Sequence, residues 1–565
     1  MKDRYSNIPS HLKEYIVSQN YNDYTQIDHA CWRFIMDVSQ SFFKDYAHGA
    51  YLNGLQGTGV STNYIPRIDD MDKKLNEVNW RAVPVRGFLP PTIFMQFQAH
   101  SILPIASDMR TVNHINYTPA PDIVHEAAGH SPIIIDKKYS KFLKEYGECA
   151  ANALFSKGDH EIYLAIRHLS DIKENPRASL EQIQSAEDNL ELLINNITFI
   201  SEASYLARLN WWTVEYGLVG TLEKPQIYGA GLLSSVSESY NAIFGDVERI
   251  PLSLDCIKYS YDITEQQPQL FVAKDFDHLS DVLAEFREQM AFKNGGIQSV
   301  ENAIKCKSVS TFTLDSGIQI SGIPIKLLSD EKERYYIFSG PVQLSYDGVE
   351  LDGHGGEYHS SGYSSPLINR DIINKIDRVA IGEEVELQLD GDIKISGVIN
   401  KKLKHDGKLL IVSFENCTVS NKSNILFDPS WGIFDLACGE FINSVKGGPA
   451  DIKNYHRYMN MELPNKDRPE YITNISERDK DLIQLYSDIH ILNNKNDVDD
   501  KQLIELVDKV IKSFSNEWLL FIEIYKIAKN NNHIDLSNQI KDIILSINYE
   551  NNDLFQIVKR RMSQI

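Results

Sequence analysis

The stretch YTPAPDIVHEAAGHSP, residues 117–132, places His125 and His130 on either side of a short, mostly apolar run. Asp122 and the two prolines before it predict the first turn of a helix, because proline tolerates that turn and an acid suits its positive end. Gly129 and Pro132 predict the end of the same helix.

The spacing of the two histidines limits which metal site they can form. Histidines four positions apart share one face of an α-helix, as in the H-E-x-x-H motif of zinc proteases. His125 and His130 are five positions apart, about 140° around an unbroken α-helix. We therefore predict that the helix ends near Gly129 and that His130 turns back from the following loop. Taken alone, H-E-x-x-x-H is also compatible with histidines that only pack or lie at the surface.

A third ligand has to come from another part of the chain, and Glu215 is the candidate. It stands in ASYLARLNWWTVEYG, residues 203–217, a helix-like run that ends at Gly217 and surrounds one carboxylate with apolar residues. Two imidazoles and one carboxylate on one face of a metal leave open positions opposite. That arrangement suits a non-haem Fe(II) centre that binds oxygen.

Five blocks of the chain extend this interpretation. They are VPVRGFL (83–89), the 117–132 stretch preceded by Arg110, WWTVEYG (211–217), IYGAGLLSSVSE (227–238) and YDITEQQPQLFVA (261–273). From about Tyr24 to Met290 the chain resembles the catalytic domain of the aromatic amino acid hydroxylases, which are pterin-dependent iron monooxygenases.

The resemblance implies a metal centre and a cofactor site. Fe(II) would be held by His125, His130 and Glu215, with O2 as cosubstrate and a tetrahydropterin of the tetrahydrobiopterin type as reductant. The cofactor contacts implied are the loop residues, the stacking aromatic and the acid beside the first histidine: Gly87, Phe88, Leu89, Phe94 and Glu126.

The resemblance also implies a substrate site. Arg110 would grip the amino acid carboxylate in bidentate fashion, helped by Thr118 and Ser234. Pro121 and Trp211 would line the pocket for the ring. Ile263 stands where phenylalanine enzymes have an apolar residue and tyrosine enzymes typically an aspartate.

An apolar wall leaves a substrate hydroxyl unpaired, at a cost of roughly 1–3 kcal/mol. The favoured reaction is therefore phenylalanine to tyrosine, with tyrosine or tryptophan hydroxylation as alternatives. Two other classes stay open: a zinc hydrolase with Glu126 as its base, and a non-catalytic binding protein.

Composition excludes several other functions. The 57 basic and 78 acidic residues give a net charge of −21, which argues against binding nucleic acid or anionic membranes. The six cysteines form no C-x-x-C pair, so neither a disulfide framework nor a thiolate zinc site is indicated. No signal peptide or membrane span is recognisable, and we expect a cytoplasmic protein. The oligomeric state stays open.

A chain of 565 residues predicts several domains. We expect a mostly α catalytic domain over 1–295, interrupted at about 157–200 by a charged helical hairpin. A small β-rich accessory domain should follow over 306–425, and then a region over 426–565 that is first irregular and then helical. We expect this second half to fold separately from the catalytic domain.

One glycine-rich loop in the β-rich segment, LDGHGGEYHSSGYSS, contains His354, Glu357 and His359. Metal binding there is an alternative, but the glycines favour an exposed loop. A competing interpretation makes this loop a lid that reaches the active site.

Overall fold

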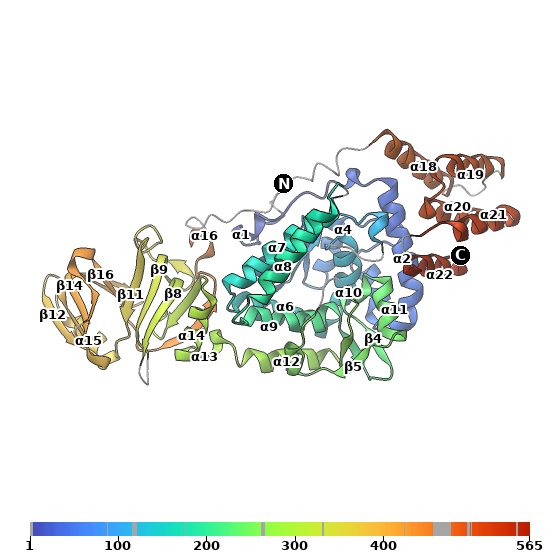
Figure 1. Cartoon of the computed structure of the whole chain (residues 1–565). Helices are drawn as coiled ribbons and strands as arrows, with labels where there is room; N and C mark the ends of the chain where they lie inside the picture. Colours follow the sequence, from blue (N-terminus) through green and yellow to red (C-terminus); the bar gives the residue numbers. More distant parts are fainter. Residues whose placement is uncertain are drawn as a thin grey trace.

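The computed structural model describes residues 4–87, 89–115, 121–175, 177–261, 266–329, 333–422, 424–455, 476–493, 498, 500–549 and 552–565. A helix-rich body occupies the centre of Figure 1, with a β-rich region on one side and the C-terminal helices on the other. The helix-rich first half and the strand-rich segment after it are thus as predicted.

The helix-rich body is built from helices of four to 21 residues around short strands. Its main helices are α1 Ser10–Lys13, α2 Gln26–Tyr46, α3 Ala50–Gly57, α4 Ile68–Asn76, α5 Pro91–Ala99, η3 Val124–His130, η4 Ser131–Ile135, α6 Lys137–Asn152, α9 Glu202–Asn210, η5 Trp211–Glu215, α10 Ala230–Leu233, α11 Val236–Phe244 and α12 Phe276–Arg287. Strands β1 Arg81–Val85 and β2 Ile102–Ala106 pair in parallel. Strands β3 Leu218–Gly220, β4 Pro225–Ile227, β5 Glu248–Pro251 and β6 Gln269–Ala273 form a second sheet in the order β4-β3-β6-β5.

Helix α2, with 21 residues, is a long, largely buried helix of this body. Thr25 caps it by a reciprocal capping box with Asp28, which satisfies backbone N–H groups at the helix start. Its apolar positions recur at three- and four-residue spacing, and residues such as Trp32 and Phe34 are fully buried.

The charged stretch after α6 forms helices α7 Lys157–Glu174 and α8 Leu180–Asn195, which pack against each other. Capping boxes begin both, at Ser156 and Ser179. Leu180 and Leu192 of α8 are exposed, so the pair lies on the surface of the body.

Two helices, α13 Ala291–Asn294 and α14 Gly296–Cys306, lead into the β-rich region, which contains two sheets and helix α15 Arg370–Arg378. The first sheet contains β7 Ser310–Leu314, β8 Ile318–Ser329, β9 Glu333–Tyr346, β10 Val349–Glu350, β11 Gly362–Pro366 and β17 Ile442–Gly447. The second contains β12 Glu384–Gln388, β13 Ile393–His405, β14 Lys408–Asn421, β15 Asn424–Phe427 and β16 Phe434–Ala437.

The predicted end of the β-rich region at residue 425 is wrong. Three strands fall at or beyond it, and β17 closes the first sheet by pairing with β7, which begins 132 residues earlier. Short strands of four to six residues give too little periodicity to be recognised, and their partners lie far away in sequence.

The C-terminal helices are α18 Glu477–Asn493, α19 Asp500–Phe514, α20 Trp518–Asn530, α21 Ile534–Ser546 and α22 Asn552–Gln564. They share one continuous apolar core with the helix-rich body, in which Trp518 of α20 packs edge-on against Phe34 of α2 at 5.0 Å between ring centroids. The expectation that they fold separately is therefore not met, because α18, α20 and α22 pack against α2, and α19 and α21 pack against α20.

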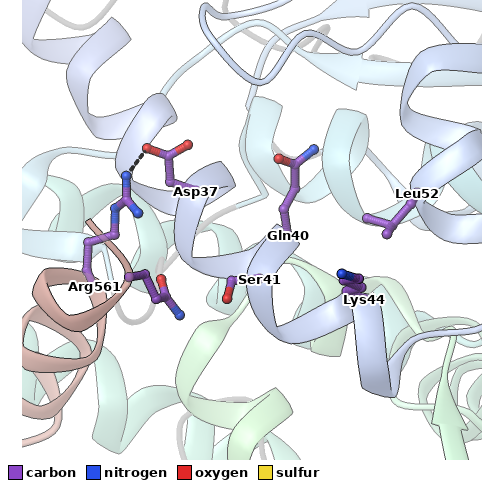
Figure 2. A pocket seen from close by; sticks show the side chains of 7 residues that line it. Asp37, Gln40, Ser41, Lys44, Leu52 and Arg561 are labelled. Carbon is purple, nitrogen blue, oxygen red and sulfur yellow. Dashed lines mark hydrogen bonds and ion pairs between the residues drawn. The ribbon is translucent and has the colours of Figure 1, made fainter. Parts of the chain in front are cut away.

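Ion pairs reinforce this junction. Arg33 Nη2 of α2 lies 2.7 Å from Glu523 Oε2 of α20, and both side chains are buried. Asp37 of α2 pairs with Lys526 at 3.1 Å and also with Arg561. Figure 2 shows the Asp37–Arg561 pair at the edge of a surface hollow between α2 and α22, lined also by Gln40 and Lys44.

Among the described residues, no helix combines the length and the apolar character needed to cross a membrane.

Candidate active site

Both segments expected to supply metal ligands are π-helices. η3 runs from Val124 to His130, and η5 from Trp211 to Glu215. In a π-helix the hydrogen bonds run from residue i to i+5, so side chains five positions apart come to the same face. His125 and His130 therefore converge without a break, and the predicted helix end near Gly129 is wrong.

Gly129 serves close packing and does not end the helix. A Cβ at this position would lie 2.6 Å from the backbone oxygen of Ala230, so η3 and α10 approach here in a way that only glycine permits. After His130 the chain tightens into the 3₁₀ turn η4, where Pro132 occupies the start.

Three ligand-type side chains meet between η3 and η5. His125 Nε2 lies 3.2 Å from His130 Nε2; His125 Nε2 lies 3.3 Å from Glu215 Oε2, and His130 Nε2 lies 3.3 Å from Glu215 Oε1. Nitrogens bound to one metal ion at about 2.0–2.1 Å lie about 2.9–3.4 Å apart for angles of 90–110°. The observed separations fit a single ion.

Neighbouring polar groups orient the first histidine. Ser234 Oγ lies 3.1 Å from His125 Nδ1, and the backbone N–H of His125 donates to Asp122 Oδ1 at 3.0 Å. A metal-binding histidine commonly has its second ring nitrogen fixed by such a partner. Asn210 Nδ2 donates to Glu215 Oε1 at 3.3 Å, across five positions of the second segment.

Arg110 is buried and forms a two-pronged ion pair with Asp122. Its Nε and Nη2 each donate to one carboxylate oxygen at 2.8 Å, and its Nη1 donates to the backbone oxygen of Ser234 at 3.1 Å. Burial disfavours the charge of Asp122, but the adjacent guanidinium holds the pKa of Asp122 below its usual value. Arg110 is therefore fixed in place beside Ser234, which also contacts His125.

Two carboxylates near the ligand cluster differ in electrostatics. Burial raises the pKa of Glu126 to about 8, although His130 opposes the shift, and Glu126 Oε2 is buried without a hydrogen-bond partner. Burial also disfavours the charge of Glu215, but His130 and His125 bring its pKa below the usual range. The Glu215 carboxylate is thus the negatively charged group of the cluster. The Glu126 carboxyl group, whose Oε2 lies 3.9 Å from His130 Nε2, is the group that carries a proton.

An aromatic stack is built on Trp211, the first residue of the helix that ends at Glu215. Trp211 stacks on Tyr261 at 4.3 Å between ring centroids and on Tyr216 at 4.6 Å, and its Nε1 donates to Gln267 at 3.2 Å. Pro121 is half-buried just before η3. Stacked rings at these distances are rigid and apolar, as a wall for a flat substrate must be.

The residues expected on the pterin side are partly described. Phe94 of α5 lies 6.4 Å from His130 between ring centroids, so this aromatic does face the cluster. Gly87 has a φ of +60° with open space around it, and Leu89 is buried. Phe88, Thr118 and Ile263 lie outside the described residues.

Sequence reasoning treated Asp122 only as a helix-start acid and missed its part in the site. The available signal was its position, twelve residues after the buried arginine and three before the first histidine. Tyr261 lies in the block YDITEQQPQLFVA, but its position in the sequence predicts no role for it. Its stacking on Trp211 depends on a loop contact that spacing does not reveal.

Comparison with known proteins places this geometry in a family. Residues 2–159 and 199–303 match the model of the biopterin-dependent aromatic amino acid hydroxylases. The first half of this chain belongs to that family. The match omits residues 160–198, which contain nearly all of α7 and α8.

Several relatives resemble this hydroxylase region. Phenylalanine-4-hydroxylase of Mesorhizobium japonicum is 27% identical over 272 residues, covering 47% of this chain and 82% of the relative. That of Ralstonia nicotianae is 27% identical over 277 residues, covering 47% and 72%. A crystal structure of phenylalanine hydroxylase from Chromobacterium violaceum, with bound iron(III) and 7,8-dihydrobiopterin, aligns at 24% identity and a TM-score of 0.38 over 49% of this chain and 86% of that one.

The hydroxylase region is therefore that of a pterin-dependent aromatic amino acid monooxygenase, an oxidoreductase. Its histidine and glutamate cluster is the candidate site for the iron of such an enzyme.

Proposed function

We propose that this protein hydroxylates the aromatic ring of phenylalanine to give tyrosine. His125, His130 and Glu215 would hold Fe(II), and a tetrahydropterin and O2 would be consumed. The observation that carries the proposal is the approach of three ligand side chains on two π-helices of a pterin-dependent hydroxylase region. The two imidazole nitrogens lie 3.2 Å apart, and each lies 3.3 Å from a different oxygen of the Glu215 carboxylate.

The residues fit a ferrous ion in number and type. Two imidazoles and one carboxylate leave open coordination positions, as oxygen-using iron sites require. When bound, iron and the reduced pterin supply the redox chemistry that activates oxygen. Side chains of this protein bind and orient the substrate and hold a proton.

Each of these side chains has a distinct task in the proposal. Arg110 binds the substrate carboxylate while Asp122 fixes its orientation. Trp211 and Pro121 hold the ring in position, and Ser234 keeps His125 in one orientation.

Glu126 holds a proton near the cofactor side, since its pKa lies near 8. Gly87, Phe88, Leu89 and Phe94 would contact the pterin, as the resemblance to the family implies.

The substrate preference rests on two supports. The relatives at 25–27% identity include several phenylalanine-4-hydroxylases. The apolar residue types at positions 211 and 263, which the resemblance assigns to the substrate pocket, offer no partner to a substrate hydroxyl, and an unpaired buried hydroxyl costs roughly 1–3 kcal/mol.

The test is a steady-state assay of the purified full chain with Fe(II), a tetrahydropterin and each aromatic amino acid. Amino acid product and pterin oxidation are measured together. We expect the highest kcat/KM with phenylalanine. A kcat/KM for tyrosine or tryptophan equal to or above that for phenylalanine would refute the substrate assignment but not the class of reaction.

Ligand variants test the class itself. His125→Ala, His130→Ala and Glu215→Ala should each lose bound iron and all hydroxylation, while circular dichroism stays that of the folded chain. His100→Ala is the matched control, because His100 ends α5 and is absent from the ligand cluster. Zinc-dependent hydrolysis without pterin oxidation would instead favour the hydrolase alternative.

A further inference from the structure

A second cluster of ligand-type side chains lies in the β-rich region. His354 Nδ1 lies 3.3 Å from His359 Nε2 and 4.0 Å from Asp435 Oδ2. One ligand atom from each of the three residues falls within 4.8 Å of the other two. The glycine-rich loop is expected to be exposed, and Glu357 and Tyr358 are. His354 is only 4% and His359 8% exposed, so the prediction is wrong for the two histidines.

Both histidines are anchored by backbone hydrogen bonds to β9. Leu344 N–H donates to the backbone oxygen of His354 at 2.9 Å, and Val342 N–H donates to that of His359 at 3.1 Å. The glycines allow the loop to fold in against the sheet, with Gly353 at a φ of +78°. These contacts lie within the β-rich region, so they do not support the idea that this loop is a lid on the hydroxylase site.

The carboxylate is anchored from the other sheet. Asp435 stands in β16 opposite Ser413 of β14, whose Oγ donates to Asp435 Oδ1 at 2.5 Å. The Tyr363 hydroxyl donates to the backbone oxygen of Asp435 at 2.8 Å. One carboxylate oxygen is thus held by a hydroxyl, as a supporting group around a metal would hold it.

The second oxygen of this carboxylate is the decisive feature. Asp435 is only 4% exposed, and its Oδ2 is buried without a hydrogen bond of normal length and angle, although the Tyr358 hydroxyl interacts with this carboxylate. A buried, unpaired polar atom costs free energy unless something binds it. Here Oδ2 faces the two imidazoles. The two imidazole nitrogens, 3.3 Å apart, have the spacing of two ligands on one ion. Tetrahedral nitrogen ligands at about 2.0–2.1 Å from a metal lie about 3.3–3.4 Å apart.

Tyr358 and two charged residues surround the cluster. The ring of Tyr358 packs edge-on against both imidazoles, at 5.6 and 4.7 Å between centroids, and is half exposed. Its hydroxyl interacts with the Asp435 carboxylate both electrostatically and as a hydrogen-bonding group. Two further charged groups, Asp352 and Lys401, act on His354 with opposite sign.

We propose that His354, His359 and Asp435 bind a divalent transition-metal ion of the Zn²⁺ class. The two sheets meet at this point, because the histidines belong to the loop on β9 and the carboxylate to β16. The bound ion joins the sheets, satisfies Asp435 Oδ2 and leaves its remaining coordination position toward Tyr358 or water. This site is separate from the hydroxylase cluster and uses none of its residues.

The experiment counts metal ions in the full chain. The hydroxylase cluster is first disabled by His125→Ala with Glu215→Ala, and the metal-free protein is titrated calorimetrically with Zn²⁺. We expect one equivalent to bind and the thermal unfolding midpoint to rise. No saturable Zn²⁺ binding in this double variant would overturn the proposal, since it keeps the second cluster intact.

Further variants locate the ion. In the same background, His359→Gln or Asp435→Asn should abolish binding of that equivalent, with the circular dichroism spectrum unchanged. His405→Ala is the matched control, because His405 is a half-exposed histidine of β13 outside the cluster, and it should keep the full equivalent. Retention of the equivalent in both His359→Gln and Asp435→Asn would equally overturn the assignment.

Discussion

The guanidinium of Arg110 and the carboxylate of Asp122 face each other as a two-pronged pair, with both contacts at 2.8 Å and both residues buried. Asp122 also accepts the backbone N–H of His125. One carboxylate thereby connects the residue proposed to grip the substrate with the segment proposed to hold the metal.

We expect removal of the Asp122 charge to lower stability strongly and to weaken substrate binding. In Asp122→Asn the Arg110 charge stays buried without its partner, which costs about 3–5 kcal/mol of unfolding free energy. We expect a lower denaturation midpoint by tryptophan fluorescence and a raised KM for the amino acid. Asp277→Asn, which breaks an exposed pair with Lys138, is the control and should leave both quantities unchanged. Equal effects in the two variants would contradict this assignment.

The packing of η3 on α10 is tested at Gly129. A Cβ there would meet the Ala230 oxygen at 2.6 Å, so Gly129→Ala must displace a helix. We expect a loss of about 1–3 kcal/mol in unfolding free energy and weaker iron retention. Gly49→Ala, where a Cβ meets nothing within 4 Å, is the matched control. Normal iron content and stability in Gly129→Ala would show that the π-helix does not depend on this contact.

The junction between α2 and α20 is tested at Glu523. Truncation to Ala leaves Arg33 buried and charged, and two of its nitrogens already have no hydrogen-bond partner. We expect Glu523→Ala to lower the unfolding free energy by about 3–5 kcal/mol and a chain cut after residue 475 to be unstable. Asp508→Ala, on the exposed face of α19, is the control. A stable, soluble fragment of residues 1–475 would restore the view that the C-terminal helices are independent.

Glu238 predicts a pH dependence of stability. Burial raises its pKa from 4.5 to about 7 in the folded chain. The folded state therefore binds a proton that the unfolded state releases, and stability falls as the pH rises from about 4.5 to 7. We expect Glu238→Gln to flatten this fall, by at most about 3 kcal/mol. The unfolding free energy is measured by denaturation at pH 5, 6 and 7. Glu181→Gln, on the exposed surface of α8, is the control. Parallel pH profiles for wild type and Glu238→Gln would contradict the effect.

Much of the hydroxylase region could be predicted from short stretches. The residue types at 125, 130 and 215 determine the donor set, and the surrounding blocks determine the family. The charged stretch after residue 156 predicts helices because its periodicity and caps are local. Such features need only neighbouring residues, so the sequence by itself determined them.

Other features depended on contacts between distant residues. Whether His125 and His130 share a face depends on a π-helix, which Gly129 permits by packing on Ala230. Whether Arg110 is solvated or paired depends on its approach to Asp122. His354 and His359 meet Asp435 only because a loop from one sheet folds against a strand of the other. Only the tertiary structure decided these, because long-range packing determines helix type, burial and the partner of each charge.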